Sequence, residues 1–182
     1  MPNALHMDQP NIKTVPNDGG NLDVVASMVK GLRRFAKSVM VISCMHQGTR
    51  YAMSATAVSE VSLDPPIMLI CVNRSANMHG ALLAGADFAI NMLSSQQEQI
   101  ARNCSGTLRG EDRFSQGDWQ ASDFGPPILS DALAYFVCRQ EQRVDHGTHS
   151  IFIGEVVAAH AAENAHSLVY VDGRYVSPSN PE

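Results

Sequence analysis

The chain has 182 residues, of which 45% are hydrophobic and 17% charged, and its formal net charge is −5 at pH 7. This length fits one globular domain with a core large enough for independent stability, and the composition excludes a disordered or repetitive chain. The acidic balance argues against sequence-independent binding of nucleic acid, which needs a basic face that neutralises phosphates. No apolar run approaches the ~20 residues that cross a bilayer, and the N-terminal sequence does not have the pattern of a signal peptide, so we expect a cytoplasmic protein.

The four cysteines are widely spaced. Cys44, Cys71, Cys104 and Cys138 form no CxxC pair, and three of them fall within apolar patterns typical of strands or helices. Buried free thiols are therefore the favoured interpretation over disulfides or a zinc site.

The N-terminal part of the chain predicts an arm followed by a helix. Residues 1–20 contain three prolines and little apolar sequence, which predicts a flexible N-terminal arm. From Asn21, which can cap a helix, apolar residues recur at helical spacing, and Arg33, Arg34 and Lys37 gather at the end of this pattern.

Two strands and a turn are predicted next. Residues 38–46 form an apolar run typical of a buried strand, Gln47-Gly48-Thr49 forms a turn, and the stretch from Tyr51 to Pro66 forms the returning strand. We expect these two strands to pair as a hairpin. Residues 67–72, after the break at Asp64-Pro65-Pro66, predict a further strand.

Two short helices are predicted in the middle of the chain. Ser75 is the expected cap of a helix that runs to about Ala86. Ser95 and Glu98 have the spacing of a capping box, which predicts a helix through about Asn103.

The second half of the chain is dominated by strand patterns. Residues 106–127 are rich in Gly, Asp, Ser and Pro, which is typical of a functional or surface-covering loop. Strands are predicted over 88–93, 132–143, 150–160 and 168–171, with a closing Gly173-Arg174-Tyr175. Strands in sequence order with hairpin-like breaks predict a mainly β fold, an antiparallel barrel with a few packed helices. No GxGxxG follows a strand, so a dinucleotide-binding Rossmann unit is not expected.

Small residues occupy the middle of the stretch from Tyr51 to Pro66. Ser54, Ala55 and Thr56 leave space in which larger apolar side chains would each contribute roughly 1.5–3 kcal/mol on burial. Small side chains on consecutive strand positions let a ligand lie against the backbone, where N–H groups donate to carbonyls and ring nitrogens. A long, flat ligand with polar edges fits this pattern. Close packing against a helix is an alternative that these residues leave equally open.

Two polar segments are further candidates for ligand binding. Asn73-Arg74-Ser75 precedes a predicted helix and combines backbone N–H groups, a positive helix end and a guanidinium, which suits an anion. A capped helix with a solvated arginine is the alternative interpretation. The segment DHGTH, Asp145 to His149, lies in the break between two long C-terminal strands, where a histidine is either simply exposed or approaches a ligand over the barrel.

Five segments of the chain, in order, resemble the short-chain NAD(P)H:flavin oxidoreductases, the flavin reductase components of two-component aromatic monooxygenases. The likeness runs from about Val24 to Tyr175 and rests on MSATAVSEVSLDPPIMLICVNRSA, FAINMLSSQQEQIA, PPILSDALAYFVC, GTHSIFIGEVV and the terminal GRY. It implies one flavin reductase-like domain over residues 21–178, folded as an antiparallel Greek-key split β-barrel of the FMN-binding type.

The resemblance also assigns candidate site residues. It implies that the ring of FAD or FMN lies against Met53, Ser54, Ala55 and Thr56, with Lys37, Ser38 and Val39 alongside. It implies that the phosphate end lies near Ser59, Asn73, Arg74, Ser75 and His79. His149 matches the histidine of the family's Gly-Asp-His motif and is the candidate catalytic residue, which helps to place NADH or NADPH. Positions near the dinucleotide are matched by Arg113, Phe114, Arg174 and Tyr175.

Two departures from the family pattern bear on these assignments. The motif reads Gly147-Thr148-His149, so a threonine replaces the usual aspartate, and His146 competes for the place of the histidine. Val58 stands where many relatives have an aromatic residue. The nucleotide preference and the role of His149 are therefore left open at this point.

The resemblance implies a reaction and partners. The reaction is hydride transfer from nicotinamide C4 to flavin N5 in a homodimer, and the reduced flavin passes to an oxygenase. Because the cofactors carry this chemistry, the protein mainly has to stack two flat rings. The alternatives are a non-catalytic FMN-binding barrel, a flavin-dependent corrinoid reductase, and a metal protein that uses Asp145, His146 and His149. An HxxH pair on a turn without a third ligand cluster is a weak signal, so no metal is expected.

Overall fold

The computed structural model describes residues 20–163 and 166–177, and the chain divides into two compact units, Met1–Arg34 and Phe35–Glu182. In the first unit, helix α1 spans Gly20–Leu32. It begins one residue before Asn21, so the expected cap lies inside the helix. The predicted flexible arm lies outside the described residues apart from Gly20, and the predicted domain of residues 21–178 takes in parts of both units.

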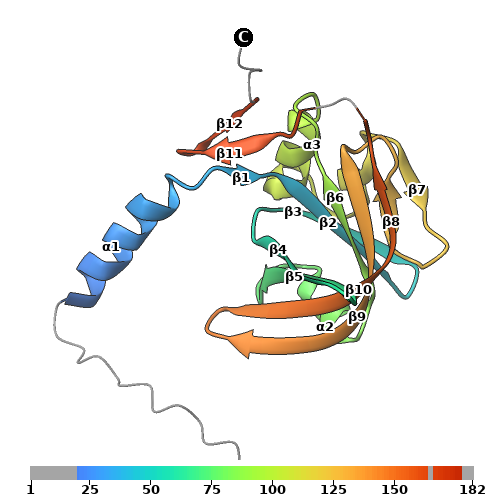
Figure 1. Cartoon of the computed structure of the whole chain (residues 1–182), viewed down its shortest axis with the longest axis horizontal. Coiled ribbons are helices and arrows are strands. Elements are labelled where there is room, and N and C mark those ends of the chain that lie inside the picture. The colour runs from blue at the N-terminus through green and yellow to red at the C-terminus, as the bar shows by residue number, and fades with distance from the viewer. Residues whose placement is uncertain (1–19, 164–165, 178–182) are drawn as a thin grey trace, which may run out of the picture. The chain divides into compact units, whose positions relative to one another are not determined.

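The second unit is organised around an antiparallel sheet of seven strands in the order β3-β2-β6-β9-β10-β5-β4 (Figure 1). These strands are β2 Met40–His46, β3 Thr49–Ala55, β4 Val58–Leu63, β5 Pro66–Asn73, β6 Phe88–Met92, β9 Ala134–His146 and β10 His149–Ala161. Among the described strands the order runs from β3 at one edge to β4 at the other as an open sheet.

Smaller elements complete this unit. A three-stranded sheet has the order β1-β11-β12, and β7 pairs with β8. The strands are β1 Lys37–Ser38, β7 Trp119–Ala121, β8 Pro127–Leu129, β11 Val169–Val171 and β12 Arg174–Val176. The helices are α2 His79–Leu83, α3 Glu98–Arg102, a π-helix Asn103–Thr107 and a 3₁₀ helix Gly110–Phe114. The prediction of a mainly β fold with a few helices is confirmed.

The hairpin of β2 and β3 forms as predicted. Gln47 and Gly48 have φ angles of 49° and 76°, the left-handed backbone that a two-residue hairpin turn requires at both central positions. The prediction of one returning strand from Tyr51 to Pro66 is wrong, because this stretch forms β3 and β4. Pairing with β2 ends at Ala55, and pairing with β5 begins at Val58.

The long hairpin of β9 and β10 forms the middle of the sheet. The register of the pair shifts between Ile153 and Gly154 and again between Val156 and Ala158, and such bulges bend strands. Figure 1 shows the pair changing direction along its length. A Cβ at Gly154 would lie 2.7 Å from the carbonyl oxygen of Arg139, so only glycine fits this backbone approach.

The predicted caps of the two short helices are also wrong. Helix α2 begins at His79, and Ser75 instead donates its backbone N–H and its hydroxyl to Asn73 Oδ1, at 2.9 and 2.8 Å. Helix α3 begins at Glu98 after Gln97, whose Oε1 accepts from the N–H of Ser94 at 2.9 Å. Side-chain bonds to the backbone before each helix have replaced the expected caps.

The core of the second unit has two main clusters. One lies against α2 and includes Phe88 and Phe152, and the other lies against α3 and includes Leu93 and Leu129. Asn91 is a fully buried polar residue of the sheet, and its side chain has hydrogen-bond partners. Its side chain donates to Val41 O and Ser43 Oγ, both at 3.0 Å, and accepts from Leu129 N at 2.8 Å. Since these bonds join β8 to the sheet, they fix the end of the loop 106–127.

All four cysteines are free, as predicted. Cys44, Cys104 and Cys138 are buried, and burial raises the pKa of their thiols to about 12, 11 and 12. Cys71 is half-buried, and burial also raises the pKa of its thiol. The three buried thiols are therefore protonated at neutral pH.

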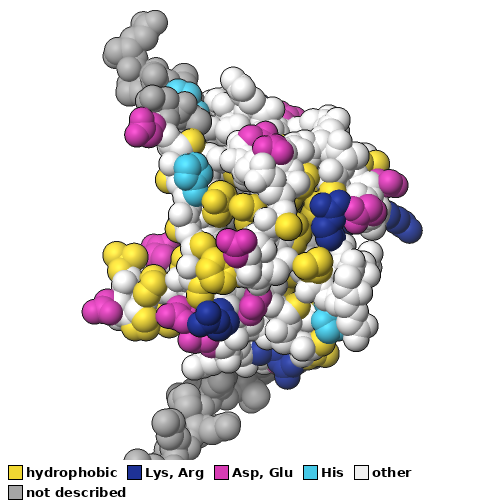
Figure 2. All heavy atoms as spheres, turned by 90° about the vertical axis from the view of Figure 1, so that its right-hand side faces the viewer, with side chains coloured by type: hydrophobic (Ala, Val, Ile, Leu, Met, Phe, Trp, Pro, Cys, Tyr) yellow, Lys and Arg dark blue, Asp and Glu magenta, His cyan; other side chains and the backbone are white. Residues whose placement is uncertain are grey.

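The surface carries mixed charge. On the face shown in Figure 2, the described Lys and Arg side chains (dark blue) are scattered between Asp and Glu side chains (magenta). Within residues 20–163 and 166–177, no helix is both long and apolar enough to cross a membrane.

Candidate cofactor site

A pocket of about 480 Å³ opens where β3, β12 and the π-helix meet. Six predicted site residues line it, namely Val39, Ser54, Ala55, Thr56, Arg174 and Tyr175. Four further lining residues were not predicted, namely Arg102, Ser105, Tyr170 and Gly173. The small-residue strand and the C-terminal GRY segment, about 120 positions apart in the sequence, therefore share one cavity.

The floor of the pocket is the end of β3. Ser54 Oγ donates to Ala101 O at 2.6 Å, which fixes α3 beside the strand and commits the hydroxyl proton. Ala55, opposite Met40, is the last rung of the β2–β3 ladder. Thr56 lies between β3 and β4, where the chain changes pairing partner. The backbone groups of Thr56 itself lie outside both ladders, so they are available to a ligand.

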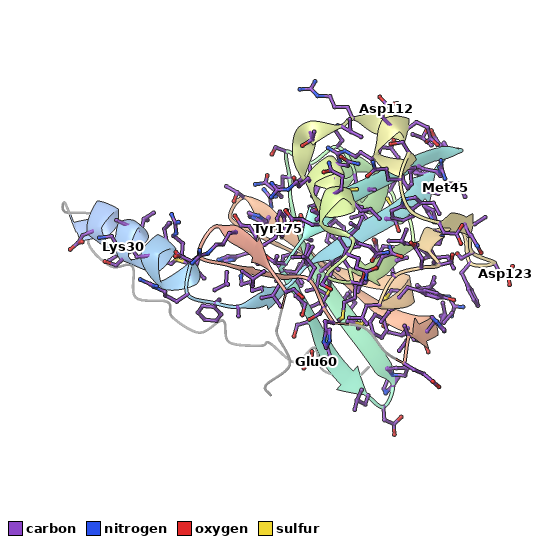
Figure 3. All side chains as sticks on the ribbon, turned by 90° about the horizontal axis from the view of Figure 1, so that it is seen from above. Lys30, Met45, Glu60, Asp112, Asp123 and Tyr175 are labelled. Carbon is purple, nitrogen blue, oxygen red and sulfur yellow. The ribbon has the colours of Figure 1, made fainter. Side chains whose placement is uncertain are left out.

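The wall of the pocket is aromatic. Tyr170 and Tyr175 are paired on β11 and β12, with ring centroids 5.2 Å apart, and Figure 3 shows Tyr175 on this hairpin. The guanidinium of Arg102 lies 5.0 Å from the centroid of the Tyr175 ring, and its Nε donates to Glu98 Oε1 at 2.9 Å. Burial raises the pKa of Tyr175, with Arg102 and Ser105 acting in the opposite direction. The phenol is therefore protonated at neutral pH and can donate a hydrogen bond.

Arg174 brings a positive charge to the pocket. Its exposed side chain forms no ion pair or hydrogen bond with any other described residue. A guanidinium without a carboxylate partner is available to an anionic group of a ligand.

A second group of predicted residues gathers at the end of β5 and the β9–β10 turn. Asn73 and His149 are paired in register, and Arg74 N donates to Thr148 O at 3.0 Å. His149 is exposed, and its Nδ1 lies 2.9 Å from Thr148 Oγ1. The structure thus places His149 beside the predicted phosphate end, and Arg174 and Tyr175 beside the predicted ring strand.

A hydrogen-bonded chain of side chains lies within this second group. His79 Nε2 lies 2.9 Å from Ser150 Oγ, which donates to Asp145 Oδ1 at 2.6 Å. Asp145 also faces Arg143 Nε at 3.3 Å and Arg74 Nη2 at 4.0 Å. The hydrogen bond from Ser150 has the largest effect and lowers the pKa of the Asp145 carboxyl. Burial acts in the opposite direction, and the charges of Arg143 and Arg74 lower the pKa further. The carboxylate is ionised at neutral pH.

The pocket is connected through β5 to this cluster of side chains, which we call the charged group and which consists of Arg74, His79, Arg143, Asp145 and Ser150. Thr56 lines the pocket, and the next residue, Ala57, accepts a hydrogen bond from Cys71 N at 2.9 Å. Asn73 lies two positions further along β5, about 7 Å at the usual rise of a strand. Only a short length of β5 therefore separates the pocket from the charged group.

Several predicted residues lie outside the pocket. Ser59 is paired with Leu69, four positions before Asn73, and its hydroxyl donates to Glu60 O at 3.0 Å. Met53 packs against the core cluster beside α2. Lys37 and Ser38 form β1, next to the pocket-lining Val39, and are paired with Tyr170 and Val169 of β11.

Arg113 and Phe114 fix the loop 106–127 against β3. Arg113 donates from Nε to Leu108 O at 2.9 Å and from Nη1 to Ala52 O. Phe114 is buried, with Trp119 at 5.0 Å and the guanidinium of Arg50 at 4.2 Å from its ring centroid. Neither side chain lines the pocket.

A partial signal for the missed residues was present in the sequence. Asp172 and Gly173 have φ angles of 50° and 80°, and Asp-Gly is a strong signal for a tight hairpin. That hairpin pairs Tyr170 with Tyr175. Arg102 had no such signal, because its place depends on the packing of α3 against β3.

The metal alternative gains no support from the described residues. Among them, no group of three or more His, Cys, Asp or Glu side chains is placed to hold a metal ion. Asp145, one of the proposed ligands, is engaged by Ser150 and two arginines.

Comparisons with known proteins find relatives among flavin reductases. The chain is 37% identical over 150 residues to the reductase component of the FADH(2)-dependent resorcinol hydroxylase of Rhizobium sp., covering 81% of this chain and 84% of the relative. It is 35% identical over 144 residues to the FMN reductase (NADH) RutF of Pantoea ananatis, covering 79% and 76%.

Two solved structures have the same fold. BorF, the flavin reductase component of a bacterial two-component tryptophan halogenase, superposes with a TM-score of 0.78 at 31% identity, covering 86% of this chain and 99% of that one. The NADH:FAD oxidoreductase SgcE6 of Streptomyces globisporus, in complex with NAD and FAD fragments, gives 0.80 at 27% identity, covering 92% and 98%. Residues 32–179 match the model of the flavin reductase like domain, and the chain belongs to this family.

Proposed function

We propose that the protein is an NAD(P)H-dependent flavin reductase, which transfers hydride from NADH to FAD or FMN and supplies reduced flavin to a partner monooxygenase. The observation that carries this proposal is the pocket in which the small residues of β3 face Tyr175 and Arg174. Relatives named as FMN reductase (NADH) and as the reductase component of a resorcinol hydroxylase support it.

The pocket fits a flavin. Its volume of about 480 Å³ is in the range of small-molecule sites, and its lining combines small residues, two tyrosines and the guanidinium of Arg174. When bound, the flavin supplies the redox chemistry by accepting hydride from the nicotinamide. Ala55 and Thr56 hold the ring edge through the backbone, Tyr175 donates from its phenol, and Arg174 pairs with negative charge.

The charged group beyond Asn73 extends this site in the proposal. Asn73, Arg74, Ser75 and His79 bind the phosphate end of the flavin, and His149 helps to place the nicotinamide nucleotide. The support is the short connection along β5 from Thr56 to Asn73 and the two arginines at its end.

We also propose a homodimer of Greek-key split barrels. A groove of about 450 Å³ is lined mainly by apolar side chains, among them Met40, Val58, Met68 and Phe136, and Leu63 at its edge is 87% exposed. Apolar surface of this kind is typical of subunit interfaces. Light scattering of Leu63→Glu should show a shift towards monomer that Leu83→Glu, at another exposed leucine, does not cause.

The deciding experiment is NADH consumption in air with FAD, FMN and riboflavin supplied separately, and with NADPH as the second donor. A reductase consumes NADH only when a flavin is present. Flavin binding without NADH consumption would identify a non-catalytic FMN-binding protein. Reduction that needs a corrinoid acceptor would identify the corrinoid reductase. Cell fractionation tests the inferred cytoplasmic location.

The role of His149 has its own test. His149→Ala should raise the NADH concentration needed for half-maximal flavin reduction in stopped flow and lower the rate, while flavin affinity stays unchanged. His146→Ala is the matched variant, because His146 is paired with His149 across the same turn. An effect of His146→Ala alone would assign the role to the other histidine.

A further inference from the structure

The chain from His79 through Ser150 to Asp145 has a defined direction. Ser150 is fully buried on β10, opposite Asp145 on β9. A hydroxyl has one proton, and an ionised carboxylate can only accept, so the 2.6 Å bond to Asp145 uses the Ser150 proton. The 2.9 Å bond between Ser150 and His79 therefore has His79 Nε2 as its donor.

This direction leaves His79 Nδ1 as the nitrogen available to a ligand. In the neutral ring Nδ1 is an acceptor, and in the imidazolium it is a second donor. The ring is held in place by Phe152, whose centroid lies 5.7 Å away at an interplanar angle of 67°. The orientation of His79 thus depends on Ser150 and Phe152, and its proton arrangement depends on Asp145.

Asp145 also holds two guanidinium groups. Arg143 Nε lies 3.3 Å from Oδ1 and Arg74 Nη2 lies 4.0 Å from Oδ2. Each guanidinium has five N–H donors, so one carboxylate leaves most of them unused. The two arginine side chains are 37% and 49% exposed, and the three charges sum to a net positive charge.

We propose that Asp145, acting through Ser150, is a positioning residue that sets His79, Arg74 and Arg143 around the phosphate of a bound flavin nucleotide. The identity of the ligand rests on the proposed function, whereas the positioning is argued from the geometry of these side chains. Charge-assisted bonds from oriented guanidinium groups are stronger and more selective than those from mobile ones.

The test compares FMN with riboflavin, which differ by the phosphate alone. Fluorescence titration of Asp145→Asn should show an affinity for FMN about tenfold weaker than in the unaltered protein, with riboflavin affinity unchanged. Ser150→Ala should show a smaller loss for FMN, about threefold, because Asp145 still holds both arginines. Glu141→Gln is the control, since it removes an exposed carboxylate of β9 and should leave both affinities unchanged.

The other outcomes overturn the proposal. Tighter FMN binding by Asp145→Asn would show that the carboxylate competes with the phosphate. Equal losses for FMN and riboflavin would show a merely structural role. A higher KM for NADH with unchanged FMN affinity would assign the group to the nicotinamide nucleotide. NADH turnover of the unaltered protein is measured separately and tests the proposed function. A protein that binds FMN more tightly than riboflavin but does not turn over NADH would contradict the proposed function and leave the positioning role of Asp145 intact.

Discussion

The pocket beside β3 and the charged group around Asp145 lie close together and are built in opposite ways. The pocket owes its volume to small side chains and to a change of strand partner at Thr56. The charged group owes its form to long polar side chains that bond one another. The proposed function therefore assigns selection of a flat ring by shape to one region and selection of an anion by charge to the other. Substitutions in the two regions should separate ring binding from phosphate binding.

The largest effect is expected from filling the pocket. Ala55→Leu places a branched side chain at the last rung of β3, where it occupies the floor. Affinity for FMN and riboflavin should fall by at least about tenfold, measured by fluorescence titration, because overpacking excludes the ring. Ala84→Leu, at an exposed position after α2, is the control for folding. If Ala55→Leu retains its affinity for both flavins, the flavin ring does not bind in this pocket.

A second substitution tests whether the two regions depend on the same hairpin. Gly154→Ala forces a Cβ to within 2.7 Å of Arg139 O, and we expect the free energy of unfolding in urea to fall by about 1–3 kcal/mol. At Gly80 an added Cβ meets no atom within 4 Å, so Gly80→Ala should not lower the free energy of unfolding. If the β9–β10 hairpin positions both regions, Gly154→Ala also weakens the binding of both FMN and riboflavin. Weaker binding of FMN alone would contradict this expectation.

A smaller effect is expected at the pocket wall. Arg102→Ala removes the guanidinium that lies 5.0 Å from the Tyr175 ring, which should weaken both flavins by about threefold. Titration of Glu98→Gln, which leaves the guanidinium on the ring and removes its ion pair, should show little change. A loss restricted to FMN would mean that Arg102 binds the phosphate and belongs functionally with the charged group.

The smallest effect concerns pH. The pKa of Asp145 is lowered in the folded protein from an ordinary value of 3.8, so its contribution to stability is fully present above that value. The contribution is lost as the pH falls through the lowered pKa. The difference in Tm between the unaltered protein and Asp145→Asn should therefore be constant from pH 7 to pH 5 and should shrink below the ordinary value. A difference that does not shrink at all as the pH falls below 3.8 would show that the carboxylate charge is not its source.

The strands were largely predictable from the sequence. The apolar run 67–72 lies within β5, and most of the run 38–46 forms β2, although Ser38 belongs to β1 of the three-stranded sheet. The turn at Gln47 and Gly48 follows from local backbone preferences. The break between β3 and β4 was missed, because a change of pairing partner at Thr56 depends on β5 and leaves no local pattern.

The predicted starts of the two short helices were wrong for a related reason. Ser75 satisfies a local rule for a cap, yet Asn73 captures its N–H and hydroxyl before the helix begins. A helix of five residues, such as α2, is fixed by packing more than by its ends.

The pocket was half predictable. Its floor has a signal in three consecutive small residues, whereas Arg102 and Tyr170 enter only when α3 and β11 pack beside β3 and β1.

The bond from Arg113 to the carbonyl of Ala52 has a consequence for engineering. It joins the loop 106–127 to the strand that carries Ser54 and Ala55, two and three positions further on. A loop transplanted from a relative would therefore have to bring an arginine at this position. Chimeras that lack this arginine should express and fold, but this bond would no longer hold the end of β3 that forms the floor of the pocket.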